Sequence, residues 1–191
     1  MQWTSGVAYV TGLDFFDEVV RANASENCNR PSPCAGWTAL DVLGHVGMAV
    51  EFGTRLLQGE QPTWKPLELP GNAVLGDPGQ WWTTKVGSAR DTVHGLDLAT
   101  EVDSPMGRRS IGQGLSFPAV DLFIHGWDLA WSFGRTVEIP DEAIAFAHQV
   151  LDQIPTQQLR SPQIFGAEIN PPAEATTTQR FIAWTGRNPL H

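Results

Sequence analysis

The chain has 191 residues, which suits one domain with a sizeable hydrophobic core, and we expect a single domain over residues 1–191. Apolar residues make up 41% of the sequence and charged residues 17%, a balance that excludes wholesale disorder. The net charge of −9 argues against nucleic acid or an anionic membrane surface as the main partner.

The beginning of the chain and its two cysteines favour a cytoplasmic protein. Residues 1–6 lack the basic segment and the apolar segment of a signal peptide, and no apolar run is long enough to span a bilayer. Cys28 and Cys34 are too few for a secreted disulfide framework, so we expect reduced thiols, although a pair between them stays open. Apart from Arg30, no basic residue or histidine adjoins them in sequence, and we expect neither to be a catalytic nucleophile.

Apolar residues at helical spacing predict an all-α chain of four main helices followed by C-terminal additions. In chain order, the expected helices are residues 12–24, 38–58, 80–98, 115–133, 141–154 and 177–184. Thr38 and Asp41 have the form of a capping box at the start of the second helix. Pro118 suits only the first turn of its helix, so the firm start is expected near that residue.

Three connecting segments carry turn signals. Residues 29–36 contain two prolines and cannot be helical. Residues 59–79 hold four prolines and four glycines, and so long a connection is typical of a functional loop. Residues 100–114 are expected to be irregular or to form a short hairpin with Gly107–Arg109 at its tip.

The candidate site lies in the fourth main helix. Asp121, His125 and Asp128 share one helical face, and their neighbours are apolar. Buried carboxylates and imidazoles must be paired with one another or with a metal. A third metal ligand would come from elsewhere, and His45, in an apolar stretch of the second helix, is the best candidate. The alternative is a buried ion pair between Asp121 and His125.

Three stretches of the sequence resemble the DinB-like superfamily, in its mycothiol-dependent maleylpyruvate isomerase branch. Pro33–His45 resembles the second-helix motif of that branch, Asp121–Ala130 its metal-helix motif, and Phe181–Pro189 the C-terminal signature of a short actinobacterial group. The resemblance implies an up-down-down-up four-helix bundle that binds a divalent metal, usually zinc.

The resemblance assigns the metal-ligand role to His45, Asp121 and His125. Much of the superfamily has Glu or His at the position of Asp121. Asp128 matches an aspartate of the motif that is not a ligand, which implies a structural role or support of a ligand.

Two histidines and one carboxylate would leave an open position on zinc, as in catalytic sites. The resemblance implies that mycothiol is the thiol bound there, and we expect an S-transferase or isomerase that directs a thiolate at a small electrophilic substrate. One alternative is a metal-assisted hydrolase, isomerase or cyclase without thiol. Another is a non-catalytic metal bundle that binds a small molecule. A homodimer is left open.

The other histidines, tryptophans and arginines are expected to be structural or solvated. We expect His94 and His148 to be solvated and His191 to be a disordered terminus. Trp37 is expected to anchor the start of the second helix in the core. Loop packing is expected for Trp64, Trp81 and Trp82, and a solvated loop tip for Arg108 and Arg109.

Overall fold

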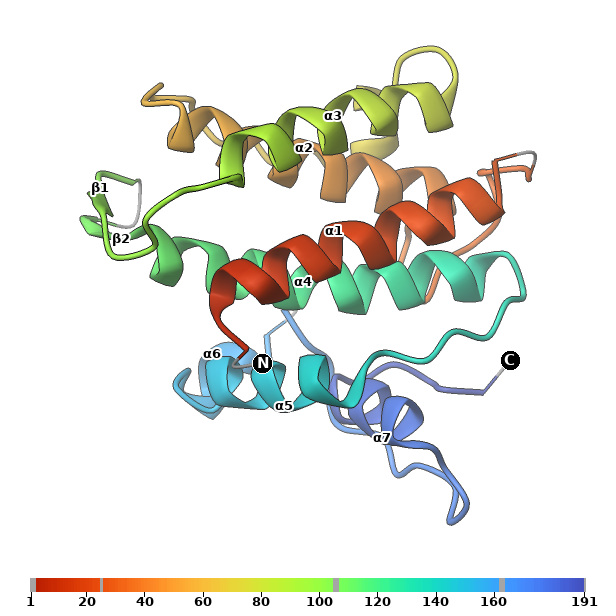
Figure 1. Ribbon diagram of the computed structural model, residues 1–191. Coiled ribbons are helices and arrows are strands. Elements are labelled where there is room, and N and C mark those ends of the chain that lie inside the picture. Colours follow the sequence, from red (N-terminus) through yellow and green to blue (C-terminus); the bar gives the residue numbers. More distant parts are fainter. Residues whose placement is uncertain (1–2, 25, 105–106, 162–163, 191) are drawn as a thin grey trace.

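The computed structural model describes residues 3–24, 26–104, 107–161 and 164–190. Four long helices form its main body, and they are α1 (Ser5–Ala22), α2 (Ala39–Leu57), α3 (Pro78–Val93) and α4 (Ile111–Ser132). Figure 1 shows that α1 and α4 run in one direction and α2 and α3 in the opposite one. Because α1 packs on α4 and α3, and α2 on α3 and α4, the four helices close into an up-down-down-up bundle. The predicted DinB-like all-α fold is confirmed.

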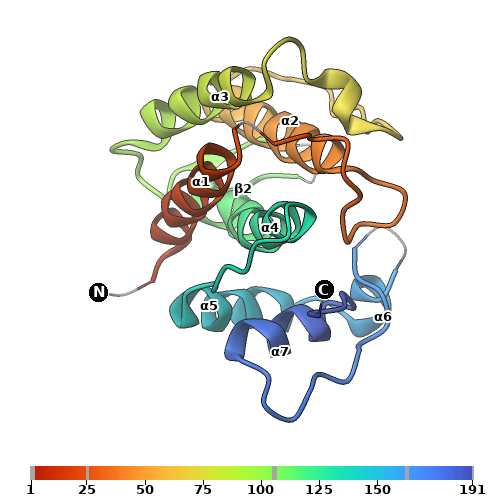
Figure 2. The same ribbon diagram turned by 90° about the vertical axis from the view of Figure 1, so that its right-hand side faces the viewer.

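Three shorter helices follow the bundle, and they are α5 (Asp141–Leu151), α6 (Thr156–Leu159) and α7 (Thr177–Trp184). Helix α5 packs on both α4 and α7. In Figure 2, α4 lies between the layer of α2 and α3 on one side and the C-terminal helices on the other. The remaining elements are the short 3-10 helix η1 (Pro70–Ala73) and an antiparallel pair of strands, β1 (Glu101–Val102) and β2 (Arg109–Ser110).

Helix α4 is enclosed on almost all sides by its neighbours. Every residue from Ala119 to Ala130 is buried except Asp121, which is half-buried. A helix that is apolar around most of its circumference stabilises the fold only when it is covered all round, and here the bundle covers one side and α5 the other. The charged groups of this helix therefore lie in the protein interior, and Asp121 marks the point where the interior meets the surface.

Gly44 permits a close approach between α2 and the loop that follows it. A Cβ atom at this position would collide with the backbone carbonyl of Pro70 and lie 2.9 Å from the amide nitrogen of Gly71. The same loop is fixed to the start of α2 by Asp41, whose Oδ1 accepts the Gly71 N–H at 2.9 Å. These contacts set the position of the half of α2 that carries His45.

Several helix ends differ from the predictions, and the caps explain the largest difference. Helix α4 begins at Ile111 and not near Pro118, because Ser110 and Gln113 form a capping box. Pro118 lies inside the helix, where it has no N–H to donate to the carbonyl four residues earlier.

Helix α1 likewise begins at Ser5, capped by Thr4, and not at Gly12. Helix α3 ends at Val93 and α5 at Leu151, each earlier than predicted, and α6 was not predicted.

Other local predictions are confirmed. Thr38 and Asp41 form the expected capping box, and α7 has the expected bounds. A short hairpin is present in residues 100–114, but Arg109, predicted at its tip, belongs to β2, and residues 111–114 belong to α4. Residues 105–106 lie outside the described residues.

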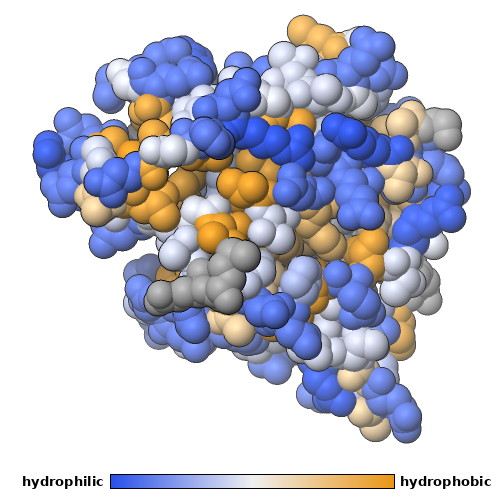
Figure 3. All heavy atoms as spheres, in the orientation of Figure 1, coloured by the Kyte–Doolittle hydropathy of each residue, from blue (hydrophilic) through white to orange (hydrophobic). Residues whose placement is uncertain are grey.

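On the face shown in Figure 3, hydrophobic residues lie in groups between hydrophilic ones. Within the part of the chain that the structure describes, none of the helices is long and apolar enough to cross a membrane.

Candidate metal centre

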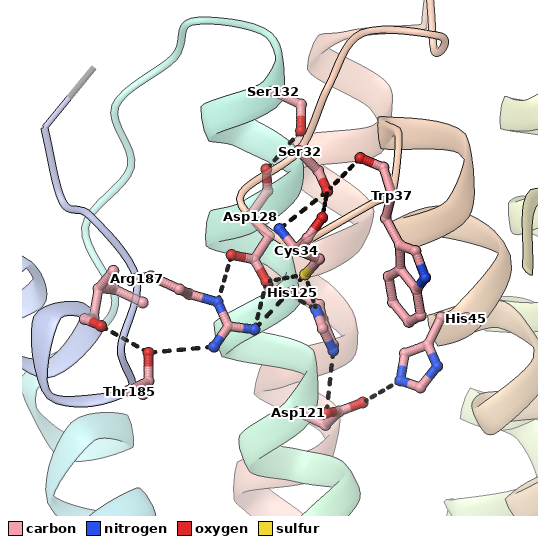
Figure 4. Close-up of polar contacts among 11 residues, drawn as sticks. Ser32, Cys34, Trp37, His45, Asp121, His125, Asp128, Ser132, Thr185 and Arg187 are labelled. Atoms are coloured by element: carbon pink, nitrogen blue, oxygen red, sulfur yellow. Dashed lines mark hydrogen bonds and ion pairs between the residues drawn. The ribbon is translucent and has the colours of Figure 1, made fainter. Parts of the chain in front are cut away.

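The three predicted metal ligands converge where α2 faces α4 (Figure 4). His45 extends from α2, and Asp121 and His125 lie one turn apart on α4. The Nε2 of His45 lies 3.5 Å from Oδ2 of Asp121, and the Nε2 of His125 lies 3.4 Å from Oδ1 of the same carboxylate. The side chains of Asp121 and His45 are 25% and 26% exposed, so the cluster is open to a small molecule from solvent.

The donor atoms fit a divalent metal ion. One ligand atom from each of His45, Asp121 and His125 lies within 4.8 Å of the others. Two N or O ligands at the usual zinc distances and a tetrahedral angle are separated by about 3.4 Å. The two nitrogen–oxygen distances are close to this value and longer than a good hydrogen bond between the same atoms. The donor atoms are therefore close enough together to hold one divalent ion, and the two histidines lie nearest to different oxygens of the Asp121 carboxylate.

Asp128 orients His125 from the other side of the imidazole ring. Its Oδ2 lies 2.9 Å from Nδ1 of His125, and since a carboxylate can only accept, Nδ1 carries the proton that is donated. In the neutral imidazole, the Nε2 atom, which faces Asp121, then offers its lone pair. A carboxylate in this position is the usual support of a metal-binding histidine. This arrangement is what the predicted supporting role of Asp128 requires.

The charges of the cluster shift the pKa values of its members. Burial would lower the pKa of His125, but the charge of Asp121 and hydrogen bonds to Asp121, Asp128 and Cys34 raise it well above the usual value. Burial would raise the pKa of Asp121, but His125 and His45 lower it well below its usual range. These opposite shifts favour the charged forms of both groups, as in the ion pair that is the alternative to a metal site.

Arg187 holds the buried carboxylate of Asp128. Its Nε lies 2.7 Å from Oδ1 and its Nη2 lies 2.9 Å from Oδ2, which is a bidentate pair. Burial would raise the pKa of Asp128, which has no exposed surface, but the charge of Arg187 and the hydrogen bond from His125 lower it. Arg187 lies within the Phe181–Pro189 motif, but no spacing rule links it to Asp128, so its role could not be predicted from the sequence.

A tight connector before α2 brings Cys34 and Trp37 to the same place. The N–H of Ser32 donates to the carbonyl of Trp37 at 3.0 Å, and the N–H of Trp37 donates to the carbonyl of Cys34 at 3.0 Å. Trp37 then packs its ring against His45, with centroids 5.1 Å apart, and against His125 at 6.3 Å. The prediction that Trp37 is only a core anchor of α2 is incomplete, because its indole also forms a wall of the site.

The surroundings of Cys34 differ from the prediction. Its Sγ lies 3.3 Å from Oδ2 of Asp128, and 3.8 Å from both Nδ1 of His125 and Nη2 of Arg187. The argument that no histidine and no cation other than Arg30 lies near the cysteines is therefore wrong for Cys34, because the fold brings in α4 and the C-terminal segment.

Both thiols are free, so Cys28 and Cys34 do not pair in this structure. Burial and the charge of Asp77 raise the pKa of Cys28, which suits the prediction that it is unreactive.

Cys34, His125 and Asp128 form a second group with metal-ligand atoms close together. Here, however, the guanidinium of Arg187 already supplies the positive charge that a metal would bring, and it occupies both oxygens of Asp128. Among the described residues, no lysine or arginine is seen to pair with His45, Asp121 or His125, and this favours that group as the candidate metal site.

The remaining candidates lie away from this centre. His94 is exposed, as predicted, and His191 lies outside the described residues. The prediction of a solvated position is wrong for His148, which packs against the rings of Phe181 and Trp184.

The tryptophans predicted to pack loops contact helices. Trp82 is fully buried and donates its indole N–H to Asp17, and Trp64 packs edge-on against Phe52. Trp81 carries Lys85 over its ring. Arg108, predicted to be solvated, is exposed but pairs with Glu101 at 2.8 Å.

Comparison with known protein families shows to which family the chain belongs. The family model of the mycothiol maleylpyruvate isomerase N-terminal domain matches residues 10–130. The chain belongs to this family. The matched region runs from within α1 nearly to the end of α4, so it contains the whole His45, Asp121 and His125 cluster together with Asp128. No curated protein and no solved structure matches the chain.

The contacts of the candidate site extend beyond the region that the family model matches. Arg187 lies beyond the matched residues, yet it contacts Asp128 within them. The mycothiol-related family therefore accounts for the bundle, and the C-terminal helices of this chain add a further side chain to the same cluster.

Proposed function

We propose that the protein is a divalent-metal-dependent enzyme in which His45, Asp121 and His125 hold the metal, with zinc the favoured ion. The observation that supports this most strongly is the convergence of two imidazole nitrogens and a carboxylate from two helices, with separations of 3.4 and 3.5 Å. Three protein ligands are typical of catalytic zinc, which keeps a further position for water or substrate.

The reaction we propose is transfer of a thiol, or thiol-assisted isomerisation, of a small electrophilic substrate. A divalent metal at this site would stabilise the thiolate form of a bound thiol, which is otherwise mostly protonated at neutral pH. Membership in the family supports mycothiol as that thiol. Two neutral imidazoles and one carboxylate would leave a net positive charge on the metal, which favours binding of an anionic sulfur.

The side chains around the cluster have separate tasks in this proposal. Asp128 fixes the tautomer and the orientation of His125. The indole of Trp37 lies over His45 and His125 and limits the access of water from that side. Between Ala119 and Ala130, Asp121 is the one residue that is not fully buried, so we expect substrate to approach from its side.

Two other functions remain as alternatives with different reacting groups. In the first, metal-bound water replaces the thiol, and the protein is a hydrolase, isomerase or cyclase. In the second, the bundle binds a small molecule without turnover. Both alternatives include the metal site, so they differ from the proposed function in whether a thiol takes part in the reaction.

Cobalt substitution tests thiol binding directly. The protein is loaded with Co²⁺, titrated with mycothiol, and followed by absorbance. Direct coordination of sulfur is expected to give a thiolate-to-cobalt charge-transfer band that saturates with one thiol per metal. Cobalt-loaded protein that shows no such band, or shows it equally with His45→Ala, would argue for the water-based alternative or for no thiol chemistry at all.

A further inference from the structure

Arg187 is held at the end of α7 by a helix-ending motif. The N–H of Gly186 donates to the carbonyl of Ala183 at 3.0 Å, and the N–H of Arg187 donates to the carbonyl of Ile182 at 3.2 Å. Gly186 has φ +87°, and a Cβ atom there would lie 2.8 Å from the backbone of Gly166. This is the hydrogen-bond pattern of a Schellman motif, which fixes the direction in which the chain leaves the helix. The backbone position of Arg187 is therefore fixed by main-chain hydrogen bonds, independently of the contacts of its side chain.

The side chain of Arg187 reaches from this turn to α4. It is only 11% exposed, and besides the bidentate pair with Asp128 it donates from Nη1 to Oγ1 of Thr185 at 3.3 Å. Figure 4 shows a chain of contacts that runs from Thr185 through Arg187, Asp128 and His125 to Asp121. Because both oxygens of Asp128 are engaged by one planar fork, the carboxylate cannot rotate freely.

The orientation of Asp128 determines the orientation of His125. The oxygen that accepts from Nδ1 of His125, Oδ2, is the same atom that Nη2 of Arg187 contacts at 2.9 Å. A rotated Asp128 would release Nδ1 and allow the imidazole to turn its Nε2 away from Asp121. Arg187 thus acts on the candidate metal ligand through one intermediate side chain.

We propose that Arg187 is a positioning residue of the metal centre, and that the C-terminal segment after α7 is thereby an integral part of the site. This inference rests on the proposed function, since it requires that His125 binds a metal. It extends the site beyond the region that the family model matches, residues 10–130. It distinguishes Arg187 from an arginine that only fastens the C-terminal helices to the bundle.

The chain offers a matched control for that distinction. Arg160 also fixes the C-terminal segment, because its Nη1 donates to the carbonyls of Gly166 at 2.9 Å and Trp184 at 2.6 Å, and its guanidinium lies over the Trp184 ring. None of these contacts involves Asp128 or a candidate metal ligand. A purely structural role would make Arg160 and Arg187 equivalent.

The test measures zinc affinity by competition with a chromophoric chelator in the full chain and in Arg187→Met, Arg187→Lys and Arg160→Met. Arg187→Met is expected to weaken zinc binding about 10–100-fold, in the range seen when the support of a metal ligand is removed. Arg187→Lys keeps the charge but not the fork, so we expect an intermediate loss. Arg160→Met is expected to lower the unfolding temperature without changing zinc affinity. The visible spectrum of the cobalt-loaded protein should change with Arg187→Met alone.

A double-mutant cycle shows whether Arg187 acts through Asp128. In the Asp128→Asn background, Arg187→Met should have no further effect on zinc affinity. If Arg187→Met alone does not fold, Arg187→Lys replaces it as the single variant of the cycle, because lysine keeps a positive charge beside the buried Asp128.

Three outcomes would overturn the inference. Equal loss of stability in Arg187→Met and Arg160→Met with unchanged zinc affinity would make Arg187 a structural clamp. A full effect of Arg187→Met in the Asp128→Asn background would remove the route through Asp128. A wild-type chain that binds no zinc or cobalt would overturn the proposed function as well, whereas normal binding in wild type and in Arg187→Met would overturn this inference alone.

Discussion

His45 and Asp121 face each other across the contact between α2 and α4, with 3.5 Å between Nε2 and Oδ2. Neither side chain is part of the buried core, and each is about one-quarter exposed. Their separation therefore depends on the distance between α2 and α4 and on how far one helix is shifted along the other. It also depends on the contacts that fix the first half of α2.

Gly44→Ala is expected to destabilise the protein through that packing. The added methyl group would collide with the backbone of Pro70, which cannot give way as a flexible side chain could. Overpacking of this kind costs about 1–3 kcal/mol in the free energy of unfolding. Urea unfolding of the variant measures this cost directly.

Gly53→Ala is the matched control on the same helix. Nothing lies within 4 Å of a Cβ atom at Gly53, so replacement by alanine should stabilise the helix by roughly 0.5–1 kcal/mol. If both variants change stability in the same direction, the close approach at Gly44 does not determine the position of α2.

Asp41 is expected to make the stability of the protein depend on pH. Burial would raise the pKa of Asp41, but hydrogen bonds from Thr38 and Gly71 lower it below its ordinary value. A carboxylate whose pKa is lower in the folded state stabilises that state fully above its unfolded pKa. This contribution is lost as pH falls through the folded pKa.

The variant Asp41→Asn tests this dependence. At pH 7 it should unfold with a free energy lower by about 1 kcal/mol, the usual size of a lost capping interaction. The difference from wild type should shrink at about pH 3, below the ordinary carboxylate pKa. Urea unfolding at the two pH values makes the comparison, and a difference of equal size at both would count against the assigned role of the Asp41 charge.

Cys34→Ser should leave the metal content unchanged. The serine hydroxyl can still donate to Oδ2 of Asp128, which lies 3.3 Å from the present sulfur. Cys34→Val removes that donor and should cost about 0.5–1.5 kcal/mol of stability while leaving the metal in place.

Elemental analysis and urea unfolding of the two Cys34 variants provide both readouts. Loss of zinc in Cys34→Ser would mean that the second group, Cys34, His125 and Asp128, holds the metal instead.

The sequence predicts the helices and the central cluster because both follow from local periodicity. The spacing of Asp121 and His125 places them on one face of α4, and Thr38 with Asp41 marks the start of α2. His45 can be predicted as the third metal ligand because it is the single histidine of an apolar helix, and the family resemblance supports that prediction. The predicted start of α4 near Pro118 is wrong, because the Ser110 cap begins the helix at Ile111.

The contacts of Arg187 and Cys34 could not be predicted from local patterns. Each reaches Asp128 from a segment distant in sequence, one after α7 and one before α2. The packing of α5 on α4 and of α7 on α5 brings Arg187 to Asp128, whereas the connector before α2 brings Cys34 there. A buried Asp128 does predict that some cation or donor must lie beside it, but it does not identify which one.

The most direct test of the central claim is the zinc content of purified wild type and of His45→Ala, Asp121→Ala, His125→Ala and Asp128→Asn, with circular dichroism to confirm folding. Wild type should hold about one zinc per chain, and each of the three alanine variants should lose it, because two remaining ligands rarely retain zinc. Asp128→Asn should keep a weakened site, with affinity lower by about 10–100-fold. If folded His45→Ala retains stoichiometric zinc, the site between α2 and α4 is wrong, and Asp121 and His125 form a buried ion pair.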